Sequence, residues 1–344
     1  MTRARDVADT QDNLGGAVAP FVAGKNAVIN GGFDIWQRGT SFAVPSTSTS
    51  SMIADRWNVF RGATGSTASR QVTGDTTNLP NIQYCLRFQR DSGNTSTANL
   101  NLIQNLETVN SIPFAGKTAT LSFYARAGAN YSATSNALIV LLRSGTGTDQ
   151  NFLNGYTGVN DVISGTATLT TTWQRFTFSG TVPTTATELA IQIQENPTGT
   201  AGANDWFEVT GVQLEIGSAA TPFARAGGSI GGELALCQRY FYAVNRNLVN
   251  RIIGQVISTN RAIPVLMFPV PMRTTPSVTY DTSTNYTVCN VSAGDATVGS
   301  ISTLASTNNS LAIDCQSVTG SPLVAGSATM FIFSTNNTNI NAEL

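Results

Sequence analysis

The sequence predicts an all-β protein: an N-terminal docking arm, then a jelly-roll β-sandwich, then a smaller C-terminal β domain with one short helix at the joint. Two observations predict this class. The chain has 344 residues, is rich in Thr, Ser, Asn and Gly, and contains 8 % aromatic residues, a mixture that suits half-buried strands and their turns. Short runs with a period of two recur along the chain, whereas helical spacing stands out in one stretch.

The composition excludes several classes of function. Histidine is absent, so the chain has no Ser-His-Asp or Cys-His nucleophile system and no His-ligated zinc or haem. Charged residues make up 11 % of the chain, against roughly 25 % in an ordinary soluble protein. Lys25 and Lys117 are the only lysines, and the net charge is −1, so we expect no nucleic-acid partner. Hydrophobic residues at 41 % are enough for a substantial core.

The apolar runs and the cysteines indicate whether the chain enters a membrane and whether it is made in a reducing compartment. The longest proline-free apolar run, Ala137–Leu142, is far too short to span a bilayer, so we expect no membrane insertion. The four cysteines are Cys85, Cys237, Cys289 and Cys315, and none forms a CxxC pair. The sequence favours free buried thiols in a protein made in a reducing cytoplasm, with a meeting of Cys289 and Cys315 across strands as the alternative.

Residues 1–25 form the predicted arm. The segment has too few apolar residues to fold alone, so we expect it to lie on another structure. Arg3, Arg5, Asp6 and Asp9 place charges of both signs along it, which suits ion pairs and hydrogen bonds to a docking partner. A solvated tail is the alternative.

Residues 26–225 form the predicted sandwich. Short strands alternate here with Ser, Thr, Gly and Pro clusters, without long helical segments. Arg175–Phe178 and Ala190–Gln194 alternate polar and apolar residues, which is typical of a sheet with one wet face.

Residues 226–344 form the predicted second β domain, which opens on the glycine-rich stretch 227–232. Leu234, Cys237, Phe241 and Val244 follow at helical spacing, while the aromatic run 240–242 favours a strand, so we expect a short helix that passes into a strand. Further on, Ile263–Met272 is apolar but carries three prolines, which predicts a loop or an edge strand; its apolar character also suits a subunit seam.

An ordered set of motifs resembles tailed-bacteriophage tail-fibre and related virion proteins. The N-terminal Thr2–Ala8 is similar to the tail-attachment ends of that group. The motifs then run in order over nearly the whole chain: Asn30–Phe42, Ala54–Trp57, Trp173–Phe176, Thr210–Gly217 with Thr221–Phe223, Glu233–Tyr240, Pro269–Arg273 and Asn341–Leu344. Any single tetrapeptide is a weak signal, and the ordered set is a strong one.

The resemblance implies a tail fibre or other virion structural protein. Its first module would resemble the jelly roll of carbohydrate-binding modules, and the chain would form a homotrimeric appendage that attaches to polysaccharide on the host surface. The N-terminal arm would dock on phage tail or adaptor proteins, and the virion would be the location. The low-charge surface rich in hydroxyl and amide groups fits this independently.

Exposed aromatic residues are the first candidates for stacking on a sugar ring. Trp36, Trp57 and Trp173 fit core packing better than binding. Trp206 follows Gly202–Asp205 and is expected to face out of a loop, with Asp205 beside it to read sugar hydroxyls. Two tyrosines on loops rich in Asn, Gly and Ser are expected to be exposed as well: Tyr131 and Tyr156.

Neither a cofactor nor catalysis is expected. Asn30–Asp34 resembles the first strand of calcium-bearing sugar-binding jelly rolls, but Val209–Val212 lacks the acids that would complete an ion site. Depolymerisation of polysaccharide would need two carboxylates across a sugar cleft, and Asp205 and Glu208 should point to opposite faces of a strand. A polysaccharide depolymerase is therefore not the leading interpretation and is kept only as an alternative. A second alternative is a purely structural, adaptor-bound or capsid-decorating virion protein that binds no glycan.

Overall fold

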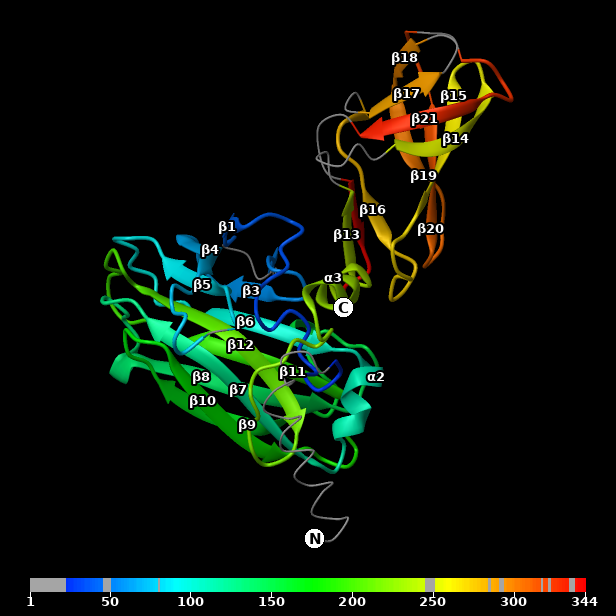
Figure 1. Cartoon of the computed structure of the whole chain (residues 1–344). Coiled ribbons are helices and arrows are strands. Elements are labelled where there is room, and N and C mark those ends of the chain that lie inside the picture. Colours follow the sequence, from blue (N-terminus) through cyan, green and yellow to red (C-terminus); the bar gives the residue numbers. More distant parts are fainter. Residues whose placement is uncertain are drawn as a thin grey trace. The chain divides into compact units, whose positions relative to one another are not determined.

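The computed structural model describes residues 23–45, 51–79, 81–244, 251–283, 286–290, 294–316, 318–320, 323–333 and 338–344 (Figure 1). The chain divides into two compact units, Met1–Leu234 with Leu344, and Ala235–Glu343. Both are built from antiparallel strands, so the predicted all-β class is confirmed. In the described part of the chain, no helix is long and apolar enough to cross a membrane.

Two six-stranded sheets form the first unit, as the jelly-roll prediction requires. The sheet we call the β12 sheet has the order β1 (Ser41–Ala43), β4 (Ser66–Val72), β5 (Tyr84–Arg90), β12 (Trp206–Ile216), β7 (Thr118–Ala127) and β10 (Gln174–Thr181). The β11 sheet has the order β2 (Ser51–Met52), β3 (Asn58–Arg61), β6 (Leu100–Leu106), β11 (Glu188–Glu195), β8 (Ala137–Gly145) and β9 (Asn160–Thr168). Short helical turns lie between strands: α2 (Thr108–Ser111), η2 (Ile112–Phe114), η3 (Thr134–Asn136) and η4 (Phe152–Asn154).

The core of the first unit follows from alternation along these strands. Leu189, Ile191 and Ile193 of β11 point inward together with Leu121 and Phe123 of β7, and all five are buried in one cluster. The intervening residues point outward, which gives each sheet one outer face.

The tryptophans expected in the core are buried. Trp36, Trp57 and Trp173 are each less than a tenth exposed. The Trp57 ring packs 5.1 Å from the Phe33 ring, measured between centroids, and its Nε1 donates to the carbonyl oxygen of Asn30. The motif around Asn30 is therefore part of the packed interior.

The predicted helix at the joint is confirmed as α3 (Ile230–Gln238), which passes into strand β13 (Phe241–Val244). Leu234 and Cys237 lie in the helix, whereas Phe241 and Val244 already lie in the strand. The predicted domain boundary at 225/226 precedes the division of the chain, which falls after Leu234 within α3.

The second unit contains two sheets. A three-stranded sheet has the order β13, β22 (Thr338–Asn341) and β16 (Ser277–Thr279). A seven-stranded sheet has the order β18 (Gly294–Thr297), β17 (Tyr286–Asn290), β21 (Ala328–Phe333), β14 (Arg251–Ser258), β15 (Arg261–Met267), β20 (Ser310–Gln316) and β19 (Ser300–Ser306).

Strand β15 corrects one expectation. The segment Ile263–Met272 was expected to be a loop or an edge strand, and residues 268–272, with Pro269 and Pro271, do lie outside the strands. Residues 263–267 belong to β15, which is an interior strand because it pairs with β14 on one side and β20 on the other. Pro264 is tolerated because the β15–β20 register has pairs at Ala262 and Val265 but none at the two residues between them, where proline lacks an N–H to donate.

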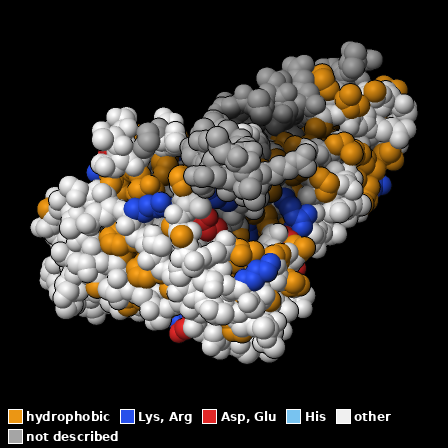
Figure 2. Space-filling model, turned by 60° about the horizontal axis from the view of Figure 1, so that its bottom comes forward, with side chains coloured by type: hydrophobic (Ala, Val, Ile, Leu, Met, Phe, Trp, Pro, Cys, Tyr) orange, Lys and Arg blue, Asp and Glu red, His pale blue; other side chains and the backbone are white. Residues whose placement is uncertain are grey.

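None of the four cysteines, all of which the structure describes, forms a disulfide, as the sequence favoured. Cys85, Cys237 and Cys315 are buried, and Cys289 is half-buried. Figure 2 shows one face of the molecule, on which charged side chains are few and uncharged surface prevails.

Candidate functional site

Trp206 begins β12 on the outer face of the β12 sheet and is half-buried. The guanidinium of Arg87 lies 4.2 Å from the centroid of its ring, which is cation–π stacking distance. Arg87 is fixed there because Glu208 accepts from its Nε and Nη2 atoms at 2.9 and 2.6 Å, and also accepts from Nε of Arg126 at 2.6 Å. One face of the indole therefore contacts protein instead of being open to a sugar.

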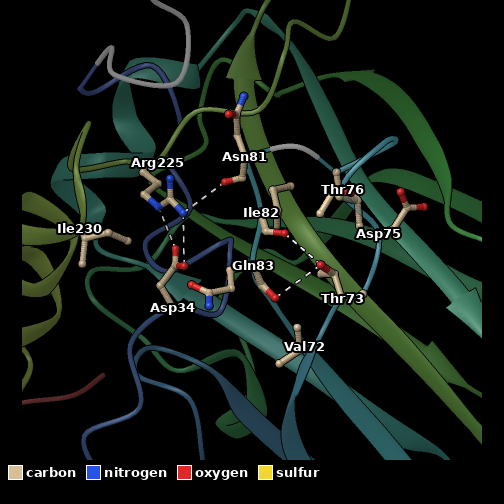
Figure 3. A pocket seen from close by; sticks show the side chains of 12 residues that line it. Asp34, Val72, Thr73, Asp75, Thr76, Asn81, Ile82, Gln83, Arg225 and Ile230 are labelled. Atoms are coloured by element: carbon tan, nitrogen blue, oxygen red, sulfur yellow. Dashed lines mark hydrogen bonds and ion pairs between the residues drawn. The ribbon is translucent and has the colours of Figure 1, made fainter.

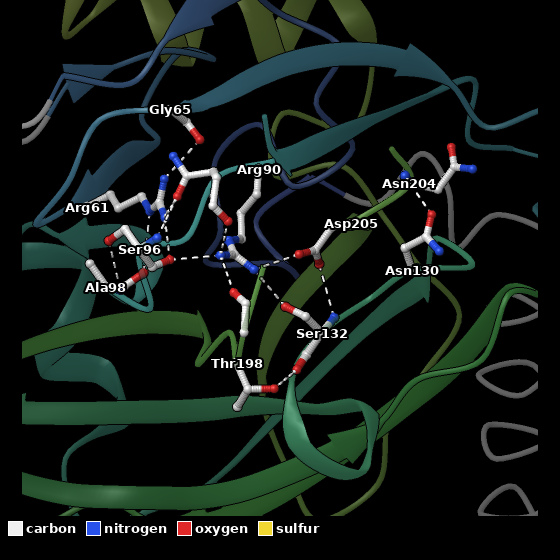
Figure 4. Close-up of polar contacts among 12 residues, drawn as sticks. Arg61, Gly65, Arg90, Ser96, Ala98, Asn130, Ser132, Thr198, Asn204 and Asp205 are labelled. Atoms are coloured by element: carbon white, nitrogen blue, oxygen red, sulfur yellow. Dashed lines mark hydrogen bonds and ion pairs between the residues drawn. The ribbon is translucent and has the colours of Figure 1, made fainter. Parts of the chain in front are cut away.

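Asp205 is buried, which differs from the expected role beside Trp206 (Figure 4). Its Oδ2 accepts from Nη1 of the fully buried Arg90 at 2.7 Å, and its Oδ1 accepts from the backbone N–H of Ser132 at 3.0 Å. Glu208 and Glu215, two acids on β12, are also buried, and both accept hydrogen bonds from neighbouring residues. These buried carboxylates therefore stabilise the fold through their hydrogen bonds.

The expectation that Tyr131 and Tyr156 are exposed is wrong, since each is 8 % exposed. The Tyr131 hydroxyl donates to the carbonyl of Ala137 at 3.0 Å, and the Tyr156 hydroxyl donates to the carbonyl of Leu189 at 3.1 Å. Burial raises the pKa of both phenols. The polar composition around the two tyrosines correctly indicates loops, but their apolar rings pack inward and their hydroxyls bond to backbone carbonyls. The predicted docking residues Arg3, Arg5, Asp6 and Asp9 lie outside the described residues.

A polar cluster fills one end of the sandwich (Figure 4). Arg61 and Arg90 are fully buried, and both donate to the carbonyl oxygen of Ser96, among other loop carbonyls. Glu195 is also fully buried, and neither of its carboxylate oxygens has a hydrogen-bond partner among the residues that the structure describes. Desolvation and the nearby Asp205 carboxylate raise the pKa of Glu195 to about 8, against the opposing effect of Arg90 and Arg61. We assign to this cluster the role of stabilising the loops whose carbonyl groups it binds.

The outer face of the β11 sheet offers a better candidate site. Asn101, Gln192, Gln194, Arg143 and Asp161 lie there on four neighbouring strands, and we call them the amide face. The Gln192 Nε2 atom donates to Asn101 Oδ1 at 2.7 Å and to Gln194 Oε1 at 2.8 Å. Gln192 Oε1 in turn accepts from Nη1 of Arg143 at 2.9 Å. Gln192 and Asn101 are 7 % and 5 % exposed, so they form the floor beneath the more accessible side chains.

Arg143 is held from three sides. Its Nε donates to Oδ1 of Asp161 at 2.9 Å, its Nη1 contacts Gln192, and its guanidinium lies 4.6 Å from the centroid of the Phe152 ring. Among the described residues, the Nη2 atom of Arg143 and the Oδ2 atom of Asp161 have no hydrogen-bond partner. The face thus presents one free donor beside one free acceptor, both oriented in advance by neighbouring side chains.

A β-bulge creates this pair. Leu142 pairs with Ile163, but Arg143 pairs with Asp161, so Val162 is the extra residue. Without the bulge Val162 would stand opposite Arg143, and Asp161 would point to the other face of the sheet. The sequence analysis missed this site, although the alternation in Ala190–Gln194 had indicated a wet face on that strand.

No metal site is found in the part of the chain that the structure describes, where no three acidic or cysteine side chains gather closely enough. Asp34, the acid of the calcium-like motif, accepts instead from Nε of Arg225 at 2.8 Å and from its Nη2 at 3.2 Å. The guanidinium supplies the positive charge beside this carboxylate.

No protein-family model matches the chain, and the search of curated proteins returned no match. Solved structures similar to it include the enzymatically active domain of bacteriophage CBA120 tailspike protein 4, at 14 % identity and a TM-score of 0.35 over 56 % of this chain. The chain spans about a fifth of that domain, 21 % of its length.

The names of two further similar structures mention a sugar-binding protein or a bound sugar. A putative sugar binding protein from Bacteroides thetaiotaomicron matches at 11 % identity and a TM-score of 0.35, covering 56 % of this chain and all of the other. TmCBM61 in complex with β-1,4-galactotriose matches at 12 % identity and a TM-score of 0.34, covering 56 % of this chain and 99 % of the other. Likenesses this weak carry no functional argument.

Proposed function

We propose that the first unit is a glycan-recognition module and that the chain is a virion appendage of the tail-fibre kind, which attaches to polysaccharide on a host surface. The observation that carries glycan recognition is the amide face, where Nη2 of Arg143 and Oδ2 of Asp161 have no partner among the described residues although the two side chains form one ion pair. Adjacent hydroxyls of a sugar each donate and accept, so a fixed donor next to a fixed acceptor suits them. Preorganisation by Gln192 and Phe152 reduces the entropy lost on binding.

The remaining parts of the proposal rest on the ordered sequence motifs. They are a homotrimer, an N-terminal arm docked on tail or adaptor proteins, and placement in the virion. The proposed activity is binding without bond cleavage. Sedimentation of the full chain tests the trimer, and a monomer would contradict it.

Binding to a glycan array and to cells of the true host tests recognition. We expect the Arg143→Ala variant of the full chain to lose about tenfold or more in affinity, because it removes a charged donor. Arg70→Ala is the matched control, since the Arg70 guanidinium also stacks on a ring, that of Tyr84 at 4.5 Å, but lies on the other sheet. Silence of the wild type on every glycan would refute recognition and favour the purely structural alternative, which the stacking of Arg87 on Trp206 also favours.

A further inference from the structure

A pocket of about 430 Å³ lies on the first unit, away from the amide face, between the loop that joins β4 to β5 and the start of α3 (Figure 3). Its volume falls within the range of small-molecule sites, roughly 300–1,000 Å³. Polar and apolar side chains share the lining. Asp34, Arg225 and Gln83 supply polar side chains, and Val72 and Ile230 supply exposed aliphatic surface.

Asp34 and Arg225 form the fixed polar wall of the pocket. Their side chains are 5 % and 15 % exposed, and Arg225 Nη2 also donates to the carbonyl of Asn81 at 3.3 Å. Within the described residues, Nη1 of Arg225 and the side-chain amide of Gln83 have no hydrogen-bond partner. Figure 3 shows the Gln83 side chain pointing toward Asp34. A free amide and a free guanidinium nitrogen thus lie on either side of one carboxylate.

The backbone conformation of the residues before Asp34 fixes the position of the Asp34 side chain. A Cβ on Gly32 would lie 2.8 Å from Oδ2 of Asp34 and 3.4 Å from the Phe223 ring, so a larger residue at this position would displace the Asp34 carboxylate. Phe33 adopts a φ of 53°, which is unfavourable for a bulky residue. It is held there by its N–H, which donates to the carbonyl of Asn30, and by its carbonyl, which accepts from the Trp36 indole. Strain of this kind persists where the surroundings fix a side chain in place.

The charge of the lining selects against anionic ligands. Asp34 already neutralises Arg225, and Asp75 adds a second carboxylate. Asp75 accepts from the backbone N–H groups of Thr77 and Asn78 and from Nδ2 of Asn78, which lowers its pKa and keeps it ionised. A carboxylated or sulfated sugar would meet net negative charge here.

We infer that this pocket is a second glycan subsite, which takes a single neutral sugar residue. Hydroxyls of the sugar would bond to Asp34, to Nη1 of Arg225 and to the Gln83 amide, and its C–H surface would lie against Val72 and Ile230. This inference extends glycan recognition to another place on the module and does not depend on the amide face.

Saturation-transfer NMR of the full chain with glucose, galactose, mannose and N-acetylglucosamine tests the subsite. We expect at least one neutral monosaccharide to give a signal that Val72→Trp abolishes, because the bulky ring would fill the rim. Val109→Trp is the matched control, since Val109 is 65 % exposed against 63 % for Val72 and does not line the pocket. Gln83→Ala removes a side chain without structural bonds and should weaken the signal about tenfold.

Each outcome decides the question. A signal that survives Val72→Trp, a signal from acidic sugars alone, or no signal from any neutral sugar would overturn the subsite. Loss of the signal in Val72→Trp with retention in Arg143→Ala would support it. Failure of the proposed function is a separate result, seen as the absence of oligosaccharide binding or its persistence in Arg143→Ala.

Discussion

The Nε atom of Arg143 on β8 lies 2.9 Å from Oδ1 of Asp161 on β9, and a one-residue bulge at Val162 brings the two strands into that register. The Asp161 side chain is half exposed, so this ion pair adds little to folding stability. Its orientation toward solvent makes it suited to contact a ligand.

Asp161→Asn should therefore separate binding from stability. We expect the free energy of unfolding to change by less than about 1 kcal/mol, because the pair is exposed to solvent. Affinity for the glycan should fall about tenfold, because a charged acceptor is replaced by a neutral one. Urea unfolding and glycan titration measure the two effects. Asp295→Asn, an exposed acid of the second unit, is the control, and equal losses in both variants would contradict the assignment.

Gln192→Leu should cost about 1–3 kcal/mol of unfolding free energy, since it leaves Asn101 Oδ1 and Arg143 Nη1 without their partner in a largely buried place. Thermal or urea unfolding checks this value. Gln194→Leu on the same strand is the control. Gln194 is half-buried, so we expect a smaller loss there. A larger loss for Gln194→Leu would show that Gln192 is not the centre of the network.

Glu195→Gln should change how stability depends on pH. The pKa of Glu195 is about 8 in the folded chain against an ordinary value near 4.5, so the folded state binds the extra proton between these values. Wild-type stability should accordingly fall as pH rises from 4.5 to 8 and level off above that range. Glutamine stays neutral, so the variant should escape this loss and become the more stable protein at alkaline pH.

Urea unfolding at a series of pH values measures this difference. Asp314→Asn gives a control of opposite sign, because hydrogen bonds from Arg261 lower the pKa of Asp314 and stabilise its charged form. That variant should lose stability at neutral pH and approach the wild type in acid. Parallel pH curves for the wild type and Glu195→Gln would mean that Glu195 is not buried in its neutral form.

Gly31→Ala should destabilise the first unit more than Gly32→Ala. A Cβ on Gly31 would meet the backbone carbonyl oxygen of Val212, which cannot move freely because Asn26 Nδ2 donates to it. We expect a loss of about 3 kcal/mol or more there, and about 1 kcal/mol at Gly32, where the nearest atom belongs to a side chain. Urea unfolding of both variants gives the order, and the reverse order would contradict the packing described.

The wet face expected on β11 is wrong, since Ala190 and Gln192 are 1 % and 7 % exposed and Gln194 is half-buried. The sequence alone did determine the all-β class and the short helix at the joint. These features depend on local alternation and spacing, as in Ala190–Gln194 and in Leu234 with Cys237, which secondary structure expresses directly. The burial of Trp173 was predictable for the same reason, since it precedes an alternating strand, whereas that of Trp36 and Trp57 was expected from the motifs to which they belong.

Only the tertiary structure decided where the candidate sites lie. Tyr131 and Tyr156 lie on polar loops, yet their rings turn inward, and their hydroxyls donate to the carbonyls of Ala137, six residues further on, and of Leu189 on β11. The pairing of Arg143 with Asp161 requires the bulge, and the pairing of Asp34 with Arg225 joins residues far apart in the chain. Side-chain direction and long-range pairing depend on which surfaces meet in three dimensions, and local sequence patterns do not encode that information.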